Sequence, residues 1–369
     1  MTIDSVEQPT PIQLVLSHLH QVEEPLFKTD LVSLEMIRNL QVGEAGQVSF
    51  TVVLATPAHP YKAKIQQACE EALYQLPFVT DVELTFGAEV IDDRRQGGIL
   101  TKSVRNTLTV ASGKGGVGKS TVAANLALAL SRQGARVGIL DLDIYGPSMP
   151  IMLGAQQIPR AREGKIMPIR QHGLKVMSMG FLVEEEAPVI WRGPMMHQAI
   201  QQLLSDVAWG DLDYLVIDLP PGTGDAQITL CQSVAISGSI MVTTPQDVAL
   251  SDVIKGIAMF RDLNVPVLGV VENMSYYQCP NCGEISYLFG QGGGQRVSER
   301  MGVDFLAQIP LDAPVREGGD TGQPVVIGWP ETPAAIALLK LSQVVAGRLA
   351  VMNRSKPVPF ASDPLLKII

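Results

Sequence analysis

The sequence is short of cysteine, of net positive charge and of long apolar runs, and each shortage excludes a class of protein. Four cysteines in 369 residues cannot form the disulfide framework of a secreted domain, so we expect a reducing, cytoplasmic setting. A net charge of −9 argues against nucleic acid as the main partner, because that binding depends on neutralising phosphates. No apolar run approaches the roughly 18 residues of a membrane span, and the N-terminus lacks the basic and apolar regions of a signal peptide. We therefore expect neither a nucleic acid nor a membrane as partner.

The length and the changes in residue pattern divide the chain into two domains. Residues 1–95 have the pattern of a small α+β domain, in which two segments are helical and two are β-rich: Ile12–Val22, Pro60–Leu76, Val48–Ala55 and Val79–Phe86. Residues 96–105 are charged, glycine-containing and without periodicity, which is typical of a linker. Residues 353–369 form a tail that contains proline and serine, and we assign it no role.

Residues 106–352 alternate between strand and helix patterns. The expected strands are Thr107–Ala111, Val137–Asp141, Leu174–Met179, Tyr214–Asp218, Ser239–Thr243, Val267–Val271 and Phe305–Ile309. The expected helices are about Lys119–Ser131, Met195–Asp206, Ala226–Ala235, Val248–Leu263, Gly293–Met301 and Ala334–Leu349. This order predicts an α/β fold, a mostly parallel sheet with helices on both faces. Ligands of such sheets bind beyond the carboxyl ends of the strands.

The segment Val110–Thr121, VASGKGGVGKST, has the pattern of a nucleotide-binding P-loop between a strand and a helix. Its glycines let several backbone N–H groups point at one anion, and the positive end of the following helix adds to that field. Lys119 is expected to reach the β- and γ-phosphates of ATP, and Ser120 to offer its hydroxyl to Mg²⁺. The expected nucleotide-binding residues of the loop are Gly113, Lys114, Gly115, Gly116, Val117, Gly118, Lys119, Ser120 and Thr121.

Carboxylates follow two other strands at the same edge of the sheet. Asp141 and Asp143 end the strand after the P-loop helix, where they serve a metal or a water, or else Asp143 caps the next turn. Asp218 ends an apolar strand of the Walker B form, and we expect it to hold Mg²⁺ through a water. The Pro-Pro-Gly run that follows suits a loop with two arrangements, with a plain tight turn as the alternative.

A CxxC pair, Cys279-Pro-Asn-Cys282, occurs in a loop and can be half a metal site or a redox pair. Cys69 and Cys231 have no CxxC partner, and their helical surroundings predict that they are core residues. If the P-loop domain forms a symmetric dimer, two CxxC pairs can meet at the two-fold axis. Their four thiolates then suit either a [4Fe–4S] cluster or zinc. A thioredoxin-type redox pair normally starts a helix in a different fold context.

The loop sequence GKGGVGKS resembles the deviant Walker A loop of the MinD/ParA/nitrogenase-iron-protein class. The resemblance implies that Lys114 contacts phosphate across a dimer interface; a solvated loop lysine is the alternative. It also implies that the Gly222 N–H meets the γ-phosphate. Asn273, in VVENMS, resembles the asparagine that selects adenine in this class, and an asparagine that closes a turn is the alternative.

A more specific resemblance covers about residues 105–350. The P-loop with Lys114, DLDIYGPSMP, WRGPM (Trp191–Met195), DLPPGTGD, TTPQDVALSD, VVENMSY and CPNCG occur in the order found in the Mrp/ApbC group of iron–sulfur cluster carriers. This resemblance implies that Asp143 orients the attacking water and Asp141 supports the magnesium shell of a slow ATPase with Lys114, Lys119 and Asp143 as catalytic groups. It further implies a [4Fe–4S] cluster that bridges two subunits through Cys279 and Cys282. The implied partners are apo iron–sulfur proteins and a cluster-assembly scaffold.

The N-terminal segments EEPLFKTDLVSLEMIRNLQV, TPAHP and LPFVTDVEL resemble the MIP18 (DUF59) family, which occurs in iron–sulfur assembly proteins. Members often carry a cysteine before the proline of the middle segment, where this chain has His59. A thiol function of this domain is therefore not expected, and we expect His59 to be a surface histidine in a loop.

Together, these resemblances imply a homodimeric ATP hydrolase that carries iron–sulfur clusters to apo-proteins, with ATP binding and hydrolysis linked to the cluster-bridged dimer. The alternative is a ParA/MinD-like partitioning or positioning ATPase with a structural zinc site. That alternative needs a C-terminal membrane helix or a basic DNA surface. The proline-containing ending SKPVPFASDPLLKII disfavours a C-terminal membrane helix. The acidic net charge disfavours a DNA-binding surface. A zinc-stapled scaffold with incidental ATPase activity is a third hypothesis.

Overall fold

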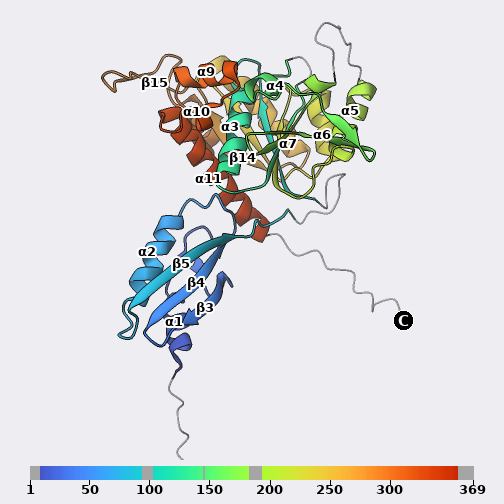
Figure 1. Ribbon diagram of the computed structural model, residues 1–369. Coiled ribbons are helices and arrows are strands. Elements are labelled where there is room, and N and C mark those ends of the chain that lie inside the picture. Colours follow the sequence, from blue (N-terminus) through green and yellow to red (C-terminus); the bar gives the residue numbers. More distant parts are fainter. Residues whose placement is uncertain (1–8, 94–102, 144–145, 183–192, 356–369) are drawn as a thin grey trace, which may run out of the picture. The chain divides into compact units, whose positions relative to one another are not determined.

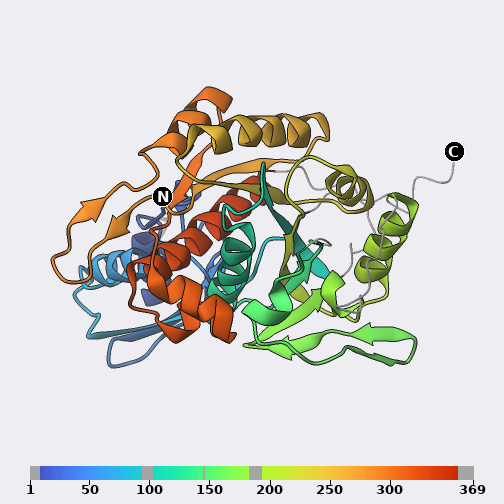
Figure 2. The ribbon, with the colours of Figure 1, turned by 90° about the horizontal axis from the view of Figure 1, so that it is seen from above.

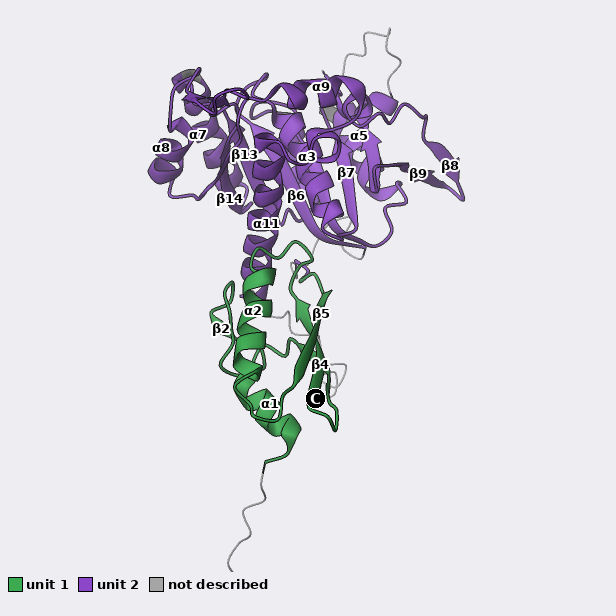
Figure 3. Ribbon diagram, turned by 60° about the vertical axis from the view of Figure 1, so that its left-hand side comes forward, with its two compact units in different colours: residues 1–91 green, residues 92–369 purple. Residues whose placement is uncertain are grey.

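The computed structural model describes residues 9–93, 103–143, 146–182 and 193–355, which fold as two compact units. The first unit spans Met1–Ile91 and the second Asp92–Ile369 (Figure 1 and Figure 3). The predicted linker, 96–105, lies mostly outside the described residues, as do the predicted tail after residue 355 and the first two residues of WRGPM. Each unit has its own core and is described separately.

The first unit is a three-stranded sheet, ordered β3-β4-β5, with two helices packed on it. Its elements are α1 (Pro11–Leu19), β1 (Glu23–Glu24), β2 (Thr29–Asp30), β3 (Ile37–Val42), β4 (Gln47–Leu54), α2 (Lys62–Leu73) and β5 (Asp81–Ala88). In the central strand β4, every second residue from Val48 to Leu54 is buried, as expected where a strand has one face on the core. The sequence did not predict β3, because IRNLQV mixes polar and apolar residues without strict alternation.

The second unit is built on an eight-stranded sheet with the order β10-β11-β7-β12-β6-β13-β14-β17. These strands are β6 (Val104–Ser112), β7 (Val137–Asp141), β10 (Ile169–Gln171), β11 (Leu174–Ser178), β12 (Leu212–Asp218), β13 (Gly238–Thr243), β14 (Val267–Glu272) and β17 (Phe305–Gln308). All neighbouring pairs are parallel except β10 with β11. Each of the seven predicted strands has its counterpart here, and the mostly parallel sheet is confirmed.

Helices cover both faces of this sheet (Figure 1 and Figure 2). They are α3 (Lys119–Arg132), α4 (Met149–Met152), the 3₁₀ turn η1 (Met179–Phe181), α5 (Gly193–Ser205), α6 (Asp225–Ser233), α7 (Asp247–Asp262), α8 (Gly293–Met301), α9 (Ala313–Thr321), α10 (Val325–Gly328) and α11 (Pro333–Arg354). On β12, Leu215 and Ile217 join the core formed with α5 to α8, and alternation turns Val216 to the opposite face, where α3 and α11 lie. Two short hairpins extend from the unit: β8 (Arg160–Arg162) with β9 (Lys165–Met167), and β15 (Tyr277–Gln278) with β16 (Ile285–Ser286).

Among the described helices, α11 alone is long and apolar enough to cross a membrane by length and composition, with a mean hydropathy of 1.6. Half of that stretch is buried inside the protein, where α11 packs against α3 and β17. Ten of the twelve residues from Lys119 to Leu130 of α3 are likewise buried, since this helix lies between the sheet and α11. The apolar sequence of α11 is thus accounted for by its place in the core.

The parallel arrangement brings four strand ends to one edge. Asp218 at the end of β12 is in register with Asp141 of β7 on one side and Val110 of β6 on the other. The P-loop continues from β6, and Asn273 follows β14 at the same edge. The sheet therefore collects the predicted nucleotide-binding segments on one side, as parallel α/β sheets do.

Candidate functional site

The P-loop joins β6 to α3, and the backbone requires glycine at several of its positions. Gly116 and Gly118 have φ angles of +80° and +81°, in the left-handed region that a Cβ disfavours. A Cβ on Gly113 would lie 2.4 Å from the backbone of Asp252, and one on Gly118 would lie 2.1 Å from the Asn273 amide nitrogen. The loop is therefore closely fitted between α7 and the end of β14, and it leads into the N-terminus of α3, the end of a helix at which anions are stabilised.

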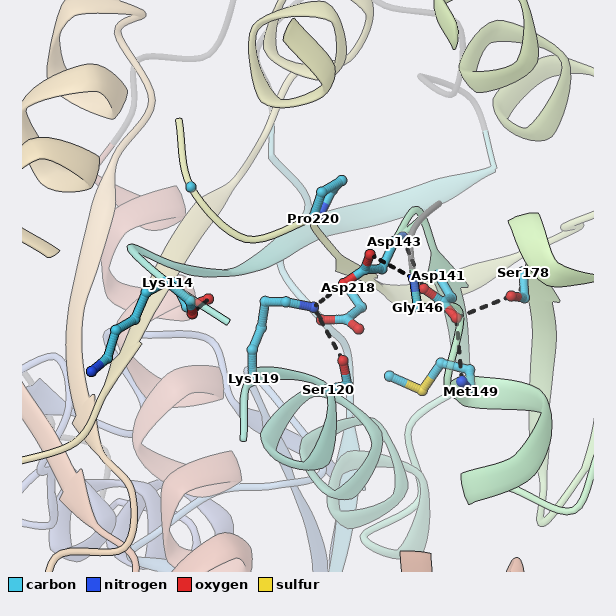
Figure 4. Close-up of polar contacts among 12 residues, drawn as sticks. Lys114, Lys119, Ser120, Asp141, Asp143, Gly146, Met149, Ser178, Asp218 and Pro220 are labelled. Atoms are coloured by element: carbon cyan, nitrogen blue, oxygen red, sulfur yellow. Dashed lines mark hydrogen bonds and ion pairs between the residues drawn. The ribbon is translucent and has the colours of Figure 1, made fainter. Parts of the chain in front are cut away.

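The Lys119 ammonium lies among acidic side chains from two strand ends (Figure 4). Its Nζ is 2.7 Å from Asp218 Oδ1, 3.6 Å from Asp143 Oδ2 and 3.1 Å from Ser120 Oγ. The Lys119 side chain is 6% exposed and that of Asp218 is fully buried. In such a place each charge depends on its partner, because a lone buried ion is strongly destabilising.

Only one oxygen of the Asp218 carboxylate is paired with Lys119. Burial raises its pKa, and the Lys119 ammonium offsets part of that rise. Asp218 Oδ2 is buried and makes no hydrogen bond within the described part of the chain. Carboxylate and hydroxyl oxygens are the ligands that Mg²⁺ prefers, so Asp218 and the neighbouring Ser120 fit a magnesium ion.

Asp141 is engaged with its own chain. Its Oδ1 accepts from the Asp143 N–H at 3.0 Å, and its Oδ2 accepts from the Met149 N–H at 3.2 Å and the Ser178 hydroxyl at 3.0 Å. Burial and the nearby Asp218 charge raise its pKa to about 7. These three hydrogen bonds fix the segment that carries Asp143. Asp141 can therefore support a magnesium shell in two ways: by holding Asp143 in place, or by giving up one of these hydrogen bonds for a bond to a magnesium-bound water.

Two predicted phosphate contacts point elsewhere. The Gly222 N–H donates to the Ser112 carbonyl at 2.9 Å, so it reaches a γ-phosphate only if the turn after Asp218 moves. The Lys114 side chain extends away from the cluster of Lys119 and the carboxylates (Figure 4). It is thus placed to meet a group outside its own loop.

A cavity of about 440 Å³ opens beside the first turn of α3, and we call it the nucleotide-side cavity. Its walls include Thr121, Asn273, Met274, Pro310, Leu311 and Asp312. The Asn273 amide nitrogen donates to the Val117 carbonyl at 2.9 Å, which ties the P-loop to the end of β14. Residues 310–312 were not predicted as part of the site, although their place directly after β17 was the available signal.

Cys279 and Cys282 lie at the tip of the β15–β16 hairpin. The Cys279 N–H donates to the Glu284 carbonyl at 2.9 Å, and the Gly283 N–H donates to the Cys279 carbonyl at 2.8 Å. The backbone N–H groups of Cys282 and Asn281 point at the Cys279 sulfur and lower its pKa. Cys279 is half-buried and Cys282 is exposed, so this tight turn presents two neighbouring thiols, of which that of Cys279 has a lowered pKa.

The two thiols have no third potential metal ligand beside them in the described part of the chain. Within the described residues, no group of three or more His, Cys, Asp or Glu side chains comes together to hold a metal. Cys69 is buried in α2, and Cys231 is half-buried in α6 against the core. Burial raises the pKa of both thiols to about 12, which makes them unreactive.

The expectation of a surface histidine at position 59 is wrong. The His59 side chain is fully buried, and its Nε2 lies 2.7 Å from Oε1 of an equally buried Glu24. The Tyr61 N–H donates to His59 Nδ1 at 3.2 Å, and the Phe27 N–H donates to Glu24 Oε2 at 2.8 Å. The sequence TPAHP suggested an exposed loop because the carboxylate that pairs with the histidine lies far away in the sequence.

Comparison with known proteins identifies the family. Residues 103–346 match the family of NUBPL iron-transfer P-loop NTPases, and residues 12–84 match a family of iron–sulfur cluster assembly proteins. The iron–sulfur cluster carrier protein of Synechocystis sp. is 47% identical over 348 residues, which cover 91% of this chain and 97% of that protein. The chain belongs to the iron–sulfur cluster carrier family. The resemblance drawn from its motifs is confirmed.

A further member of the carrier family and two solved structures are also similar to this chain. The iron–sulfur cluster carrier protein of Escherichia coli K12 is 41% identical over 91% of this chain and 92% of its own length. A nucleotide-binding protein from Archaeoglobus fulgidus in complex with ADP is 42% identical, with a TM-score of 0.54, and the match covers 60% of this chain and 87% of that one. The cell division ATPase MinD of Pyrococcus furiosus is 25% identical with a TM-score of 0.51, over 65% and 98% of the two chains. The expected P-loop NTPase fold is therefore confirmed.

Proposed function

We propose that this protein carries an iron–sulfur cluster held between Cys279 and Cys282 of two subunits, and that ATP controls its delivery to apo-proteins. The observation that carries the proposal is the half-site at the hairpin tip. Two thiols stand together with backbone N–H groups aimed at one sulfur, and no further metal ligand of the described chain joins them. Four-coordinate metal sites need two more ligands, which a second copy of the hairpin supplies.

The cargo that suits this donor set is a [4Fe–4S] cluster. Four cysteine thiolates are its usual ligands, and N–H groups directed at the sulfurs stabilise the bound form. An exposed hairpin tip also suits transfer, because a recipient's thiols can reach the cluster there. The recipients are apo iron–sulfur proteins, a cluster-assembly scaffold supplies the cluster, and the setting is the cytoplasm.

ATP is bound and slowly hydrolysed at the P-loop in this proposal. Lys119 and the loop residues 113–121 hold the phosphates, Asn273 selects adenine, and Ser120 and Asp218 hold Mg²⁺, which neutralises phosphate charge. Asp143 orients the water whose oxygen attacks the γ-phosphorus as ADP leaves, with Asp141 supporting Asp143. Lys114 reaches the phosphates bound by the other subunit, which its direction away from its own cluster supports (Figure 4).

Coupling between ATP and the cluster needs a part of the protein with two arrangements that the nucleotide distinguishes. The turn after Asp218 is suited to this role. Gly222 has a φ of +93° and its N–H is bonded to Ser112. A γ-phosphate that takes this N–H would move the turn, and loss of the γ-phosphate would return it.

The deciding experiment is anaerobic reconstitution with iron and sulfide, followed by an absorption spectrum and an iron count. We expect a broad visible charge-transfer band and about four irons per dimer. Cys282→Ala should lose the band, whereas Cys231→Ala should keep it, since Cys231 lies in α6 against the core. A colourless wild-type protein that holds zinc would overturn the carrier proposal and favour the positioning ATPase. Stoichiometric iron in Cys282→Ala would overturn the bridging site.

A further inference from the structure

The two cysteines lie on a long excursion that leaves the sheet after β14 and returns at α8. We call residues 275–294 the cysteine arm. It contains the β15–β16 hairpin, and it begins only a few residues after Asn273 of the nucleotide-side cavity. Both of its ends are held by one side chain, Glu272, which is the last residue of β14 and is fully buried.

The outgoing end of the arm is bonded to Glu272 and to the segment after β17. The Ser275 hydroxyl donates to Glu272 Oε1 at 2.5 Å. The Ser275 N–H donates to the Ile309 carbonyl at 3.0 Å, and the Leu311 N–H donates to the Tyr276 carbonyl at 2.7 Å. The first residues of the arm thus run along residues 309–311 and cannot shift without them.

The returning end is bonded to the other oxygen of the same carboxylate. The Gly294 N–H, in the first turn of α8, donates to Glu272 Oε2 at 2.6 Å. A Cβ on Gly294 would lie 3.0 Å from Glu272 Cβ, and one on Gly293 would lie 2.4 Å from the Pro245 carbonyl oxygen, so the approach depends on glycines. A carboxylate at this end of a helix is also stabilised by the helix dipole.

The arm and the nucleotide-side cavity share a wall. A second cavity of about 500 Å³, the cysteine-side cavity, is lined by Tyr277, Cys279 and Gly283 of the arm. Pro310, Leu311 and Asp312 line both this cavity and the nucleotide-side cavity. Any displacement of these three residues by a nucleotide therefore acts directly on the outgoing end of the arm.

We infer that Glu272 is a positioning residue that fixes both ends of the cysteine arm to the nucleotide-side cavity, so that the bound nucleotide sets the exposure of Cys279 and Cys282. This inference rests on the proposed function, because it assigns a regulatory element to the same cysteines. The side chain of Glu272 is hydrogen-bonded to Ser275, Gly294 and Gln308. Its carboxylate joins Ser275 to Gly294, and its neighbour Asn273 bonds the P-loop.

The test uses the full-length, cluster-free protein and the reactivity of its thiols. Iodoacetamide modification of Cys279 and Cys282 is followed by peptide mass spectrometry without nucleotide, with Mg·ADP and with Mg·ATP. In the wild type we expect the modification rate of Cys279 and Cys282 with Mg·ADP to differ from that with Mg·ATP. Glu272→Gln replaces one of the two acceptor oxygens by an NH₂ group. That group cannot accept from the Gly294 N–H, and if it faces Ser275 instead, the Ser275 hydroxyl must accept where it now donates. In this variant we expect one raised rate in all three conditions. The rise should be about tenfold, which corresponds to about 1.4 kcal/mol of lost restraint.

Two further variants make the result specific. Glu299→Gln is the matched control, because it makes the same chemical change at an exposed residue of α8 whose carboxylate accepts a hydrogen bond from the Gln295 side chain. It should behave as wild type. Ser275→Ala removes one bond and leaves the Gly294 bond in place, so it should show a smaller rise and a weakened nucleotide response. If the melting temperature of Glu272→Gln shows that this variant does not fold, Ser275→Ala serves as the test variant in its place.

The outcomes separate this inference from the proposed function. If the wild type responds to nucleotide and Glu272→Gln responds equally, the role of Glu272 is overturned while cluster carriage stands. If the wild-type rates do not depend on nucleotide, the inference is also overturned. If reconstitution of the wild type yields no cluster but the alkylation rates behave as described, the carrier proposal fails and the link between nucleotide and cysteine arm holds.

Discussion

Lys119 lies among three acceptors, Asp218, Asp143 and Ser120, and a phosphate would compete with them for its ammonium. The acidic partners hold the side chain near the place where the β- and γ-phosphates are expected. At the residue scale the Lys119 side chain is therefore fixed in place without a ligand, and it has little conformational freedom left to lose.

Lys119→Ala should weaken ATP binding by about a hundredfold or more, because charge-assisted hydrogen bonds to phosphate are lost. The fold should survive, since the Asp218 carboxylate can take up a proton where its pKa is already raised. Titration calorimetry with ATP measures the change. Lys255→Ala is the control, because Lys255 is 72% exposed and pairs only with Asp252 in the described structure. Equal affinities in both variants would refute the assignment of Lys119.

At the scale of the elements, an ion pair joins the start of β7 to β12 at the edge of the sheet away from the nucleotide. Asp213 accepts from the Arg136 N–H at 2.8 Å, from its Nε at 3.2 Å and from its Nη2 at 2.9 Å. Burial raises the pKa of Asp213, but the bonds and charge of Arg136 outweigh it and the net shift is downward. The ionised form of Asp213 is thus more stable, relative to the protonated form, in the folded state than in the unfolded state.

The sign of the effect on stability follows from that shift. A carboxyl whose folded pKa lies below its unfolded value stabilises the fold above the unfolded value of 3.8, and this contribution disappears as the pH falls through the folded pKa. Asp213→Asn should therefore lower the free energy of unfolding by about 1–2 kcal/mol at pH 7, with Arg136 half-exposed to solvent. The difference from wild type should shrink below about pH 4.

Urea denaturation at several pH values measures this difference. Asp211→Asn is the control, because Asp211 is 80% exposed and 3.9 Å from the guanidinium, and its effect should stay below about 0.5 kcal/mol. A loss of stability in Asp213→Asn that is the same at pH 3 and pH 7 would contradict the ion-pair explanation.

The elements also show how far the sequence alone can lead. Buried strands such as β7 and β12 could be predicted because both of their faces are covered, which makes them continuous apolar runs. The strands β8 and β9 were missed, since each has only three residues and they are mostly exposed. Glycine, lysine and aspartate marked the P-loop and the strand ends, but Glu272 and the pair of His59 with Glu24 left no pattern. Their roles depend on contacts between residues that are distant in the sequence.

At the scale of the whole molecule, every described residue of the nucleotide and cysteine sites belongs to the second unit. A chain that starts at Asp92 should therefore bind ATP with an affinity within about twofold of the full-length protein and accept the same cluster. Titration with ATP and reconstitution with iron and sulfide measure both properties. Loss of ATP binding on removal of the first unit would contradict this expectation.

The proposed half-site at the hairpin tip has a kinetic consequence. If one chain offers two of four ligands, uptake of a cluster requires an encounter of two chains, and it becomes second order in protein at low concentration. Capacity would then rise more steeply than the amount of protein, and dilution alone would favour release of the cargo. The cellular abundance of the chain would itself act as a threshold, below which single chains remain empty and above which a small increase loads most of them.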